Sequence, residues 1–153
     1  MATVFETPAD LKNAIGKQLG VSDWLEIDQQ RIDKFADATG DHQWIHLDVE
    51  RCKKESPYGC TIAHGYYTLS LMPMLMAQVW KLTGARMGVN YGLNKLRFPA
   101  PVPVGKKVRA HATLQDCKEI EGGYHMSSPQ KLKLKTRKNQ SPQLKPSLER
   151  IPN

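Results

Sequence analysis

The chain has 153 residues, which is enough for one domain with a sizeable core and too few for two. Its apolar fraction of 40% and charged fraction of 24% are ordinary for a soluble globular protein, and its 3 cysteines form no CxxC pair, which argues against a zinc site or a disulfide framework. The net charge of +7 does not indicate a nucleic-acid partner, because residues 127–153 hold 7 basic residues and one acid, whereas residues 1–126 hold 15 basic and 14 acidic residues.

The first third of the chain predicts two helices with an extended segment between them. Apolar residues at helical spacing predict a helix over residues 7–19, and alternation predicts a strand over residues 23–27. A second helix is predicted over residues 28–39, with its first residue as the N-cap and Gly40 as its stop. A polar loop with a short helical turn is expected over residues 41–59.

Residues 62–80 contain no Asp, Glu, Lys or Arg. A transmembrane span needs about this length, but His64, Gln78 and Pro73 interrupt the segment. A helix that is apolar all round is also typical of a core element enclosed by a sheet. The segment therefore predicts a buried central helix, bent at Pro73, and no membrane partner.

The remainder of the chain has the period-two pattern of strands. One strand is predicted over residues 87–98, and the turn PAPVPVG reverses the chain into a second strand over residues 107–117. The apolar residues of this second strand fall on one face: Val108, Ala110, Ala112 and Leu114. Gly122 and Gly123 predict a hairpin turn into a third strand.

Two short segments carry the candidate chemistry, FADATGDHQWIH at residues 35–46 and TIAHGYYTLSL at residues 61–71. Asp41 and His46 can converge on one water molecule, which is what water addition to an activated double bond requires. Gly65, in the first turn of the predicted central helix, can present its backbone N–H to a developing oxyanion.

Each of these residues also has an ordinary structural interpretation. Asp41 suits a turn after a helix, and His46 and His64 suit a core in which their hydrogen bonds are satisfied. Gly65 suits close packing where a helix meets a sheet. The residues alone leave both interpretations open.

The motifs resemble those of the MaoC-like (R)-specific enoyl-CoA hydratases, whose signature runs approximately Gly-Asp-x-Asn-Pro-apolar-His. Gly40, Asp41, Ile45 and His46 match this signature, while Gln43 and Trp44 stand in place of Asn and Pro. DHQWIH, followed by IAHG and NYGLNKLRFPAPVPVG, is similar to the nodulation protein N-like branch. The resemblance covers residues 5–125.

This resemblance implies an α+β hot-dog fold, in which an antiparallel sheet wraps around a long central helix, and a homodimer. It implies hydration of trans-2-enoyl-CoA to (R)-3-hydroxyacyl-CoA, with Asp41 and His46 activating the water and the Gly65 N–H polarising the thioester carbonyl. No metal or organic cofactor is expected. Further candidates line the substrate pocket: Gln43, Trp44, His64 and Tyr66.

Two other functions remain open on the sequence, a catalytically silent acyl-CoA-binding protein and a hot-dog thioesterase. The expected partners are an acyl-CoA thioester and a second copy of the chain. The N-terminus has no basic segment followed by an apolar one, so the expected location is the cytoplasm.

The last part of the chain departs from the pattern of the relatives, which end in two long strands. We expect residues 1–126 to form the hot-dog domain and residues 127–153 to be a basic, atypical tail that leaves the C-terminal strands incomplete. Leu132 and Leu134 could still face the core from a short strand, while the composition beyond Arg137 is that of a disordered region. A frameshift is one hypothesis, because the codons of Arg137–Ser141, read one frame over, can encode Glu-Lys-Pro-Val. A splice variant is the other.

Overall fold

A computed structural model describes residues 2–135. Its helices are α1 (Pro8–Lys12), α2 (Gln29–Thr39), α3 (Trp44–Leu47), α4 (Val49–Glu55), α5 (Gly65–Ser70) and α6 (Met72–Val79). Its strands are β1 (Thr3–Phe5), β2 (Gln18–Val21), β3 (Leu25–Glu26), β4 (Trp80–Leu82), β5 (Lys107–Thr113), β6 (Asp116–Ile120), β7 (Gly123–Ser127) and β8 (Gln130–Leu134).

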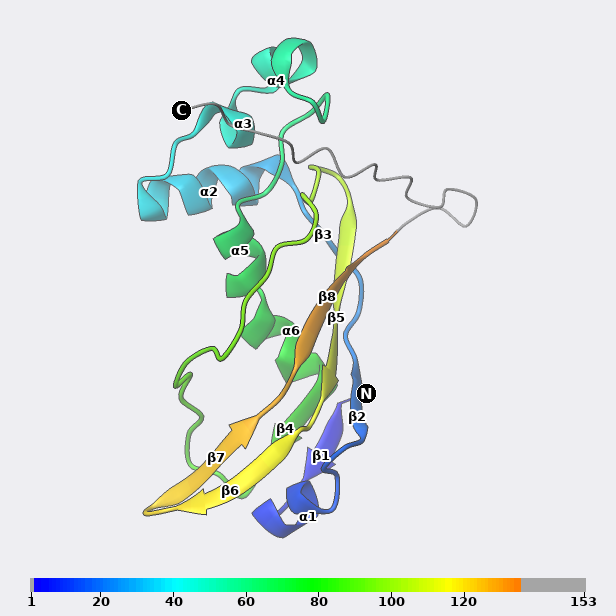
Figure 1. The fold of residues 1–153 in the computed structure, drawn as a ribbon, viewed down its shortest axis with the longest axis vertical. Helices are drawn as coiled ribbons and strands as arrows, with labels where there is room; N and C mark the ends of the chain where they lie inside the picture. Colours follow the sequence, from blue (N-terminus) through cyan, green and yellow to red (C-terminus); the bar gives the residue numbers. More distant parts are fainter. Residues whose placement is uncertain (1, 136–153) are drawn as a thin grey trace.

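Strand β5 is the centre of the main sheet (Figure 1). β2 and β3 pair antiparallel with one of its edges, and β8 pairs antiparallel with the other, with Ala110 opposite Leu132. β6 and β7 form a hairpin that projects from the end of this sheet, while β1 and β4 form a separate parallel pair. The arrangement is therefore a mixture of helices with a mainly antiparallel sheet.

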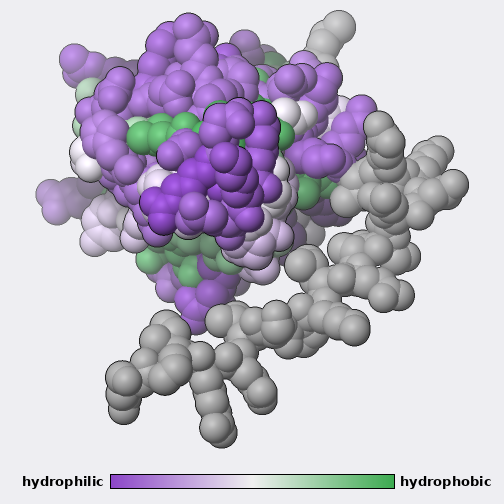
Figure 2. Space-filling model, turned by 90° about the horizontal axis from the view of Figure 1, so that it is seen from above, coloured by the Kyte–Doolittle hydropathy of each residue, from purple (hydrophilic) through white to green (hydrophobic). Residues whose placement is uncertain are grey.

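The core lies between the sheet and the α5–α6 helices, which run along one face of it (Figure 1). The side of β5 that faces the core matches the predicted face, since Val108, Ala110 and Ala112 are buried. The core also receives buried apolar side chains from other elements: Leu11, Leu19, Ile27, Ile32, Tyr67, Leu71, Leu75 and Val79. Viewed from the end that carries α4, the surface is mostly hydrophilic (Figure 2).

The prediction for α2 is confirmed at both ends. The Asp28 side chain accepts a hydrogen bond of 2.8 Å from the Arg31 backbone N–H, which satisfies a free donor in the first turn. Gly40 has a left-handed backbone with φ +78°, a conformation that glycine adopts without strain, and it ends the helix. α2 thus ends immediately before Asp41.

The predicted helix over residues 7–19 is wrong beyond its first half. Thr7 caps α1, and the helix ends at Lys12. The chain then turns at Gly16, whose φ is +81° and whose N–H donates to the Leu114 carbonyl oxygen at 2.8 Å. Residues 18–21 join the sheet as β2, where pairing with β5 satisfies their backbone groups.

The central helix is interrupted near the predicted bend at Pro73: residues 65–79 form two consecutive helices, α5 and α6, on either side of Leu71, whose own backbone stays helical. The break precedes Pro73, which occupies the first turn of α6, where its missing N–H leaves no hydrogen bond unmade. Burial covers one face rather than the whole circumference, since Tyr66 and Met74 are exposed. No helix in residues 2–135 is long and apolar enough to span a membrane.

The predicted strand over residues 87–98 is wrong. The segment has no regular secondary structure, and most of its apolar side chains are exposed, Tyr91 by 88%, while Leu96 is half-buried. A strand is held by hydrogen bonds to a neighbouring strand, and within the described residues no strand pairs with this segment, although the Tyr91 ring packs 5.2 Å from that of His125 on β7. Alternation alone therefore did not produce a strand.

The prediction for residues 107–117 is confirmed over β5, although the strand breaks after Thr113 and β6 begins at Asp116. The hairpin turn is confirmed, with Gly122 at φ +77° between β6 and β7. Leu132 and Leu134 pack against the core from β8. The rest of the predicted tail, 136–153, lies outside the described residues, and the domain boundary at residue 126 stays a prediction.

Candidate functional site

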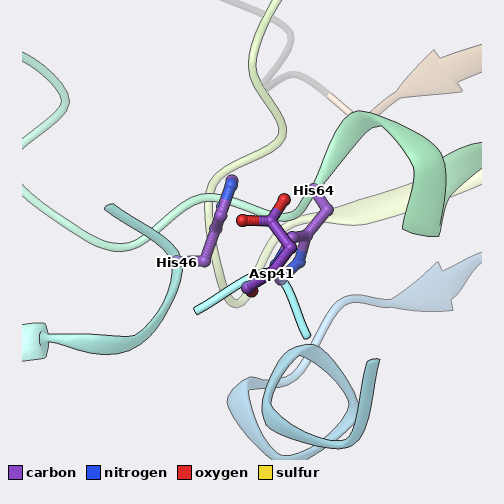
Figure 3. Close-up of side chains that lie close together, drawn as sticks. All are labelled: Asp41, His46 and His64. Atoms are coloured by element: carbon purple, nitrogen blue, oxygen red, sulfur yellow. The ribbon is translucent and has the colours of Figure 1, made fainter. Parts of the chain in front are cut away.

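Three chain segments bring Asp41, His46 and His64 together (Figure 3). Asp41 follows the glycine that ends α2, His46 lies on α3, and His64 is the residue immediately before α5. One carboxylate oxygen and one nitrogen of each imidazole lie within 4.8 Å of one another. The structure thus places the predicted pair in contact range and adds a second histidine to it.

His46 is buried, with 6% of its surface exposed. Its Nδ1 lies 2.7 Å from the Ile62 carbonyl oxygen. Because a carbonyl oxygen only accepts, Nδ1 carries the hydrogen and donates it, which leaves Nε2 with a free lone pair. Burial lowers the pKa of His46 below its ordinary value, and the neighbouring His64 lowers it further, against the opposing effects of the Ile62 carbonyl and Asp41. A neutral imidazole with a free Nε2 is the form that a general base requires.

His64 is 2% exposed and stacks on His46, with ring centroids 3.8 Å apart and an interplanar angle of 26°. Its Nε2 lies 3.0 Å from the backbone carbonyl oxygen of Asp41, so this nitrogen carries the hydrogen and donates it. Its Nδ1 is buried and has no hydrogen-bond partner. The ring of Phe35 packs near that of His64, at 5.1 Å between centroids. His64 thus links the Asp41 loop to the start of α5.

The Asp41 side chain lies at the open side of the site and is exposed. Its carboxylate lies beside both imidazole rings (Figure 3), and its Oδ1 accepts a long hydrogen bond of 3.4 Å from the Gln43 backbone N–H. Two imidazole nitrogens and a carboxylate oxygen are also a donor set that divalent transition metals accept. Chemically, the site offers three hydrogen-bond acceptors to one small molecule.

Gly65 begins α5, and its backbone N–H donates to no group within residues 2–135. Its lack of a side chain matters, because a Cβ at this position would lie 2.8 Å from Cδ2 of Phe98. Tyr66 points outward, 67% exposed, and meets the edge of the Phe98 ring at 5.9 Å between centroids. Phe98 is therefore a site neighbour that the sequence did not single out.

The other predicted pocket residues lie at the margin. Gln43 is exposed and precedes α3 without capping it through its side chain. Trp44 is half-buried under the Arg51 guanidinium, 4.2 Å from the ring centroid. Two surface hollows beside β1 include none of the site residues.

Sequence reasoning also missed Gln29 and Thr61. The Gln29 amide nitrogen donates to the His46 carbonyl oxygen at 2.8 Å, and its amide oxygen accepts from the buried Thr61 hydroxyl. These bonds tie the first turn of α2 to α3 and to the segment before α5. The partners are 17 and 32 residues away along the chain, so no local pattern marks them.

Comparison with known proteins gives consistent matches. The profile of the family described as "MaoC like domain" matches residues 10–135. The 3-hydroxyacyl-thioester dehydratase Z of Mycobacterium tuberculosis is 52% identical over 119 residues, which cover 78% of this chain and 78% of that protein. Nodulation protein N of Rhizobium leguminosarum is 49% identical over 110 residues, 71% of this chain and 68% of that protein.

Solved structures are similar at lower identity. A MaoC-like dehydratase from Rhodospirillum rubrum matches with a TM-score of 0.62 and 20% identity, over 81% of this chain and 84% of that one. An R-hydratase from Pseudomonas aeruginosa matches with a TM-score of 0.57 and 22% identity, over 77% of this chain and 71% of that one. These similarities confirm the predicted hot-dog fold.

Proposed function

The chain belongs to the MaoC-like dehydratase family, and on that premise we propose that it catalyses the reversible hydration of trans-2-enoyl-CoA to (R)-3-hydroxyacyl-CoA. The observation that carries this proposal is that a carboxylate oxygen of Asp41 and a ring nitrogen of His46 lie within 4.8 Å of each other, while the bond from Nδ1 to the Ile62 carbonyl leaves Nε2 of His46 free. A water molecule held there would meet a carboxylate and a neutral base at once.

The reaction balances with these two groups alone. The water oxygen attacks C3 of the enoyl thioester while His46 Nε2 takes one of its protons, and the electrons of the C2–C3 double bond move into a thioester enolate. The proton held by His46 then passes to C2, which completes the addition of water and returns His46 to its neutral form. The Gly65 N–H is the proposed donor to the enolate oxygen, in support of which it has no other partner in the described chain.

The thioester substrate is supported by the names of the relatives, which include a 3-hydroxyacyl-thioester dehydratase and a 3-hydroxybutyryl-CoA dehydratase of Methylorubrum extorquens. We also propose Gln43, Trp44, His64 and Tyr66 as pocket residues, because they lie in or next to α3 and the start of α5. We further propose that the chain acts as a homodimer in the cytoplasm, and light scattering tests the dimer directly.

The test is hydration of crotonyl-CoA, followed by loss of the enoyl-thioester absorbance, with the Asp41→Asn variant beside the wild type. We expect Asp41→Asn to lower kcat by about 10²–10⁴-fold, the usual contribution of acid–base groups. Asp37→Asn is the matched control, because Asp37 is an exposed aspartate whose side chain pairs with His42. Equal activity of wild type and Asp41→Asn would refute the assigned role.

Two additions to this assay separate the competing functions. Release of free CoA thiol without hydration would show a thioesterase, and binding without either reaction would show a silent acyl-CoA-binding protein. Dialysis against a chelator before the assay tests the metal-capable donor set, and we expect the hydration rate to be unchanged.

A further inference from the structure

The two histidines of the site are held in opposite tautomers. His46 uses Nδ1–H to donate to the Ile62 carbonyl, and His64 uses Nε2–H to donate to the Asp41 carbonyl. Neutral imidazole has one N–H and one lone pair, so the free lone pairs are on Nε2 of His46 and on Nδ1 of His64. The backbone, which provides both carbonyls, therefore fixes where each ring can accept a hydrogen bond.

The free nitrogen of His64 is unusual for a core histidine. It is buried without a hydrogen-bond partner on a side chain that is 2% exposed. Most buried polar atoms in folded proteins are hydrogen-bonded, and a buried acceptor without a donor is unfavourable. A small molecule that brings an O–H to this nitrogen relieves that deficit.

His64 also belongs to the acceptor cluster. The rings of His46 and His64 stack at 3.8 Å, and ligand-capable atoms of both histidines and Asp41 lie within 4.8 Å of one another. A water molecule has two hydrogens to donate. If the Asp41/His46 pair takes one, the other needs an acceptor in a different direction, and His64 is the remaining group.

We propose that His64 is a third catalytic residue, whose Nδ1 accepts the second hydrogen of the attacking water. This inference rests on the proposed hydration. With both hydrogens held, the oxygen lone pair is directed away from the three groups, towards C3 of the substrate. As the C3–O bond forms, the O–H bond to the Asp41/His46 pair breaks and its proton passes to His46. The other O–H remains intact and becomes the 3-hydroxyl of the product, still donating to His64.

Two substitutions separate this role from the structural role of His64, which is to donate a hydrogen bond to the Asp41 carbonyl. His64→Gln places an amide nitrogen near the position of Nε2, so it keeps a donor for the Asp41 carbonyl and loses the acceptor at Nδ1. His64→Asn places an amide oxygen near the position of Nδ1, so it keeps an acceptor for water and loses the donor. Circular dichroism melting of both variants checks that they fold.

The measurement is kcat and KM for crotonyl-CoA in the wild type and in these variants. We expect kcat of His64→Gln to fall at least tenfold with KM little changed, and His64→Asn to retain the higher kcat of the two. A His64→Gln variant that equals or exceeds His64→Asn overturns the inference, because only the link to the Asp41 carbonyl would then matter. An inactive wild type overturns the proposed function itself, which is a different result.

Nitrogen-15 NMR of the imidazole rings gives a readout that does not depend on activity. The expected spectrum shows His64 as the Nε2–H tautomer and His46 as the Nδ1–H tautomer. Finding His64 protonated on Nδ1 would overturn the inference whatever the kinetics, since that nitrogen could then accept nothing.

Discussion

Gln29 connects three parts of the site, and replacing it with alanine tests whether that connection holds His46 in place. Its amide nitrogen donates to the His46 carbonyl at 2.8 Å and to Asp33 Oδ1 at 2.8 Å, and its amide oxygen accepts from the Thr61 hydroxyl. Thr61 has no exposed surface, and Gln29→Ala removes the acceptor of its hydroxyl.

The size of the effect follows from these contacts. Each of the bonds to His46 and Thr61 contributes about 1 kcal/mol net, and the stranded Thr61 hydroxyl adds to the loss, so Gln29→Ala should lower the free energy of unfolding by about 2–3 kcal/mol. The exposed bond to Asp33 adds little. Because α3 is then held less firmly, we also expect kcat for enoyl-CoA hydration to fall.

Urea unfolding followed by circular dichroism measures this change. With a denaturant slope of about 2 kcal/mol/M, the midpoint should fall by about 1 M. Gln30→Ala is the control, since it makes the same substitution one residue on at an exposed position, where about 0.5 kcal/mol or less is expected. Equal midpoints for the two variants would show that Gln29 does not tie these segments together.

Four further predictions concern the site and its support. Burial lowers the pKa of His46 below its ordinary 6.5, so kcat/KM for hydration should stay level as the pH falls through 6.5 and decline only below it; an acid limb at or above 6.5 would contradict this. As the pH falls, His46 takes up its proton at a higher pH in the unfolded chain than in the folded one. The free energy of unfolding should therefore be highest above pH 6.5 and fall below it, as urea titrations at several pH values would report. Gly65→Ala should lower the melting temperature because its Cβ meets the Phe98 ring at 2.8 Å, and adding Phe98→Ala should restore it; no recovery would mean that the crowding lies elsewhere. Ile32→Ala removes a fully buried side chain of α2 and should lower the free energy of unfolding by about 2–5 kcal/mol, whereas a loss below about 1 kcal/mol would show a loosely packed core.

The sequence predicted those elements whose limits are set by local chemistry. Asp28 and Gly40 mark the ends of α2 through a side-chain cap and a left-handed backbone, and Gly122 marks the β6–β7 turn in the same way. The alternation of β5 predicted its buried face because one side of that strand meets the core. Each of these signals comes from residues within the predicted element or next to it.

Several of the failures depended on distant partners. α1 ends early because residues near Gly16 bond to the distant Leu114. The segment 87–98 alternates like a strand, but no strand in the described residues pairs with it. Within the site, the motif predicted Asp41 and His46, while the stacking of His64 on His46 depends on how α5 meets α3, which spacing along the chain does not encode.

Strand β8 has one free edge in the part of the chain that the structure describes, because its backbone pairs with β5 alone. Such an edge can add a strand from another molecule. Here Leu132 and Leu134 face the core, while Lys131, Lys133 and Lys135 are exposed along the opposite side. Two copies of β8 laid edge to edge would bring these rows of like charge together, and the repulsion opposes their pairing. At physiological ionic strength, salt screens charges over about 8 Å, so added salt weakens this repulsion. The colloidal stability of the protein therefore falls as the salt concentration rises.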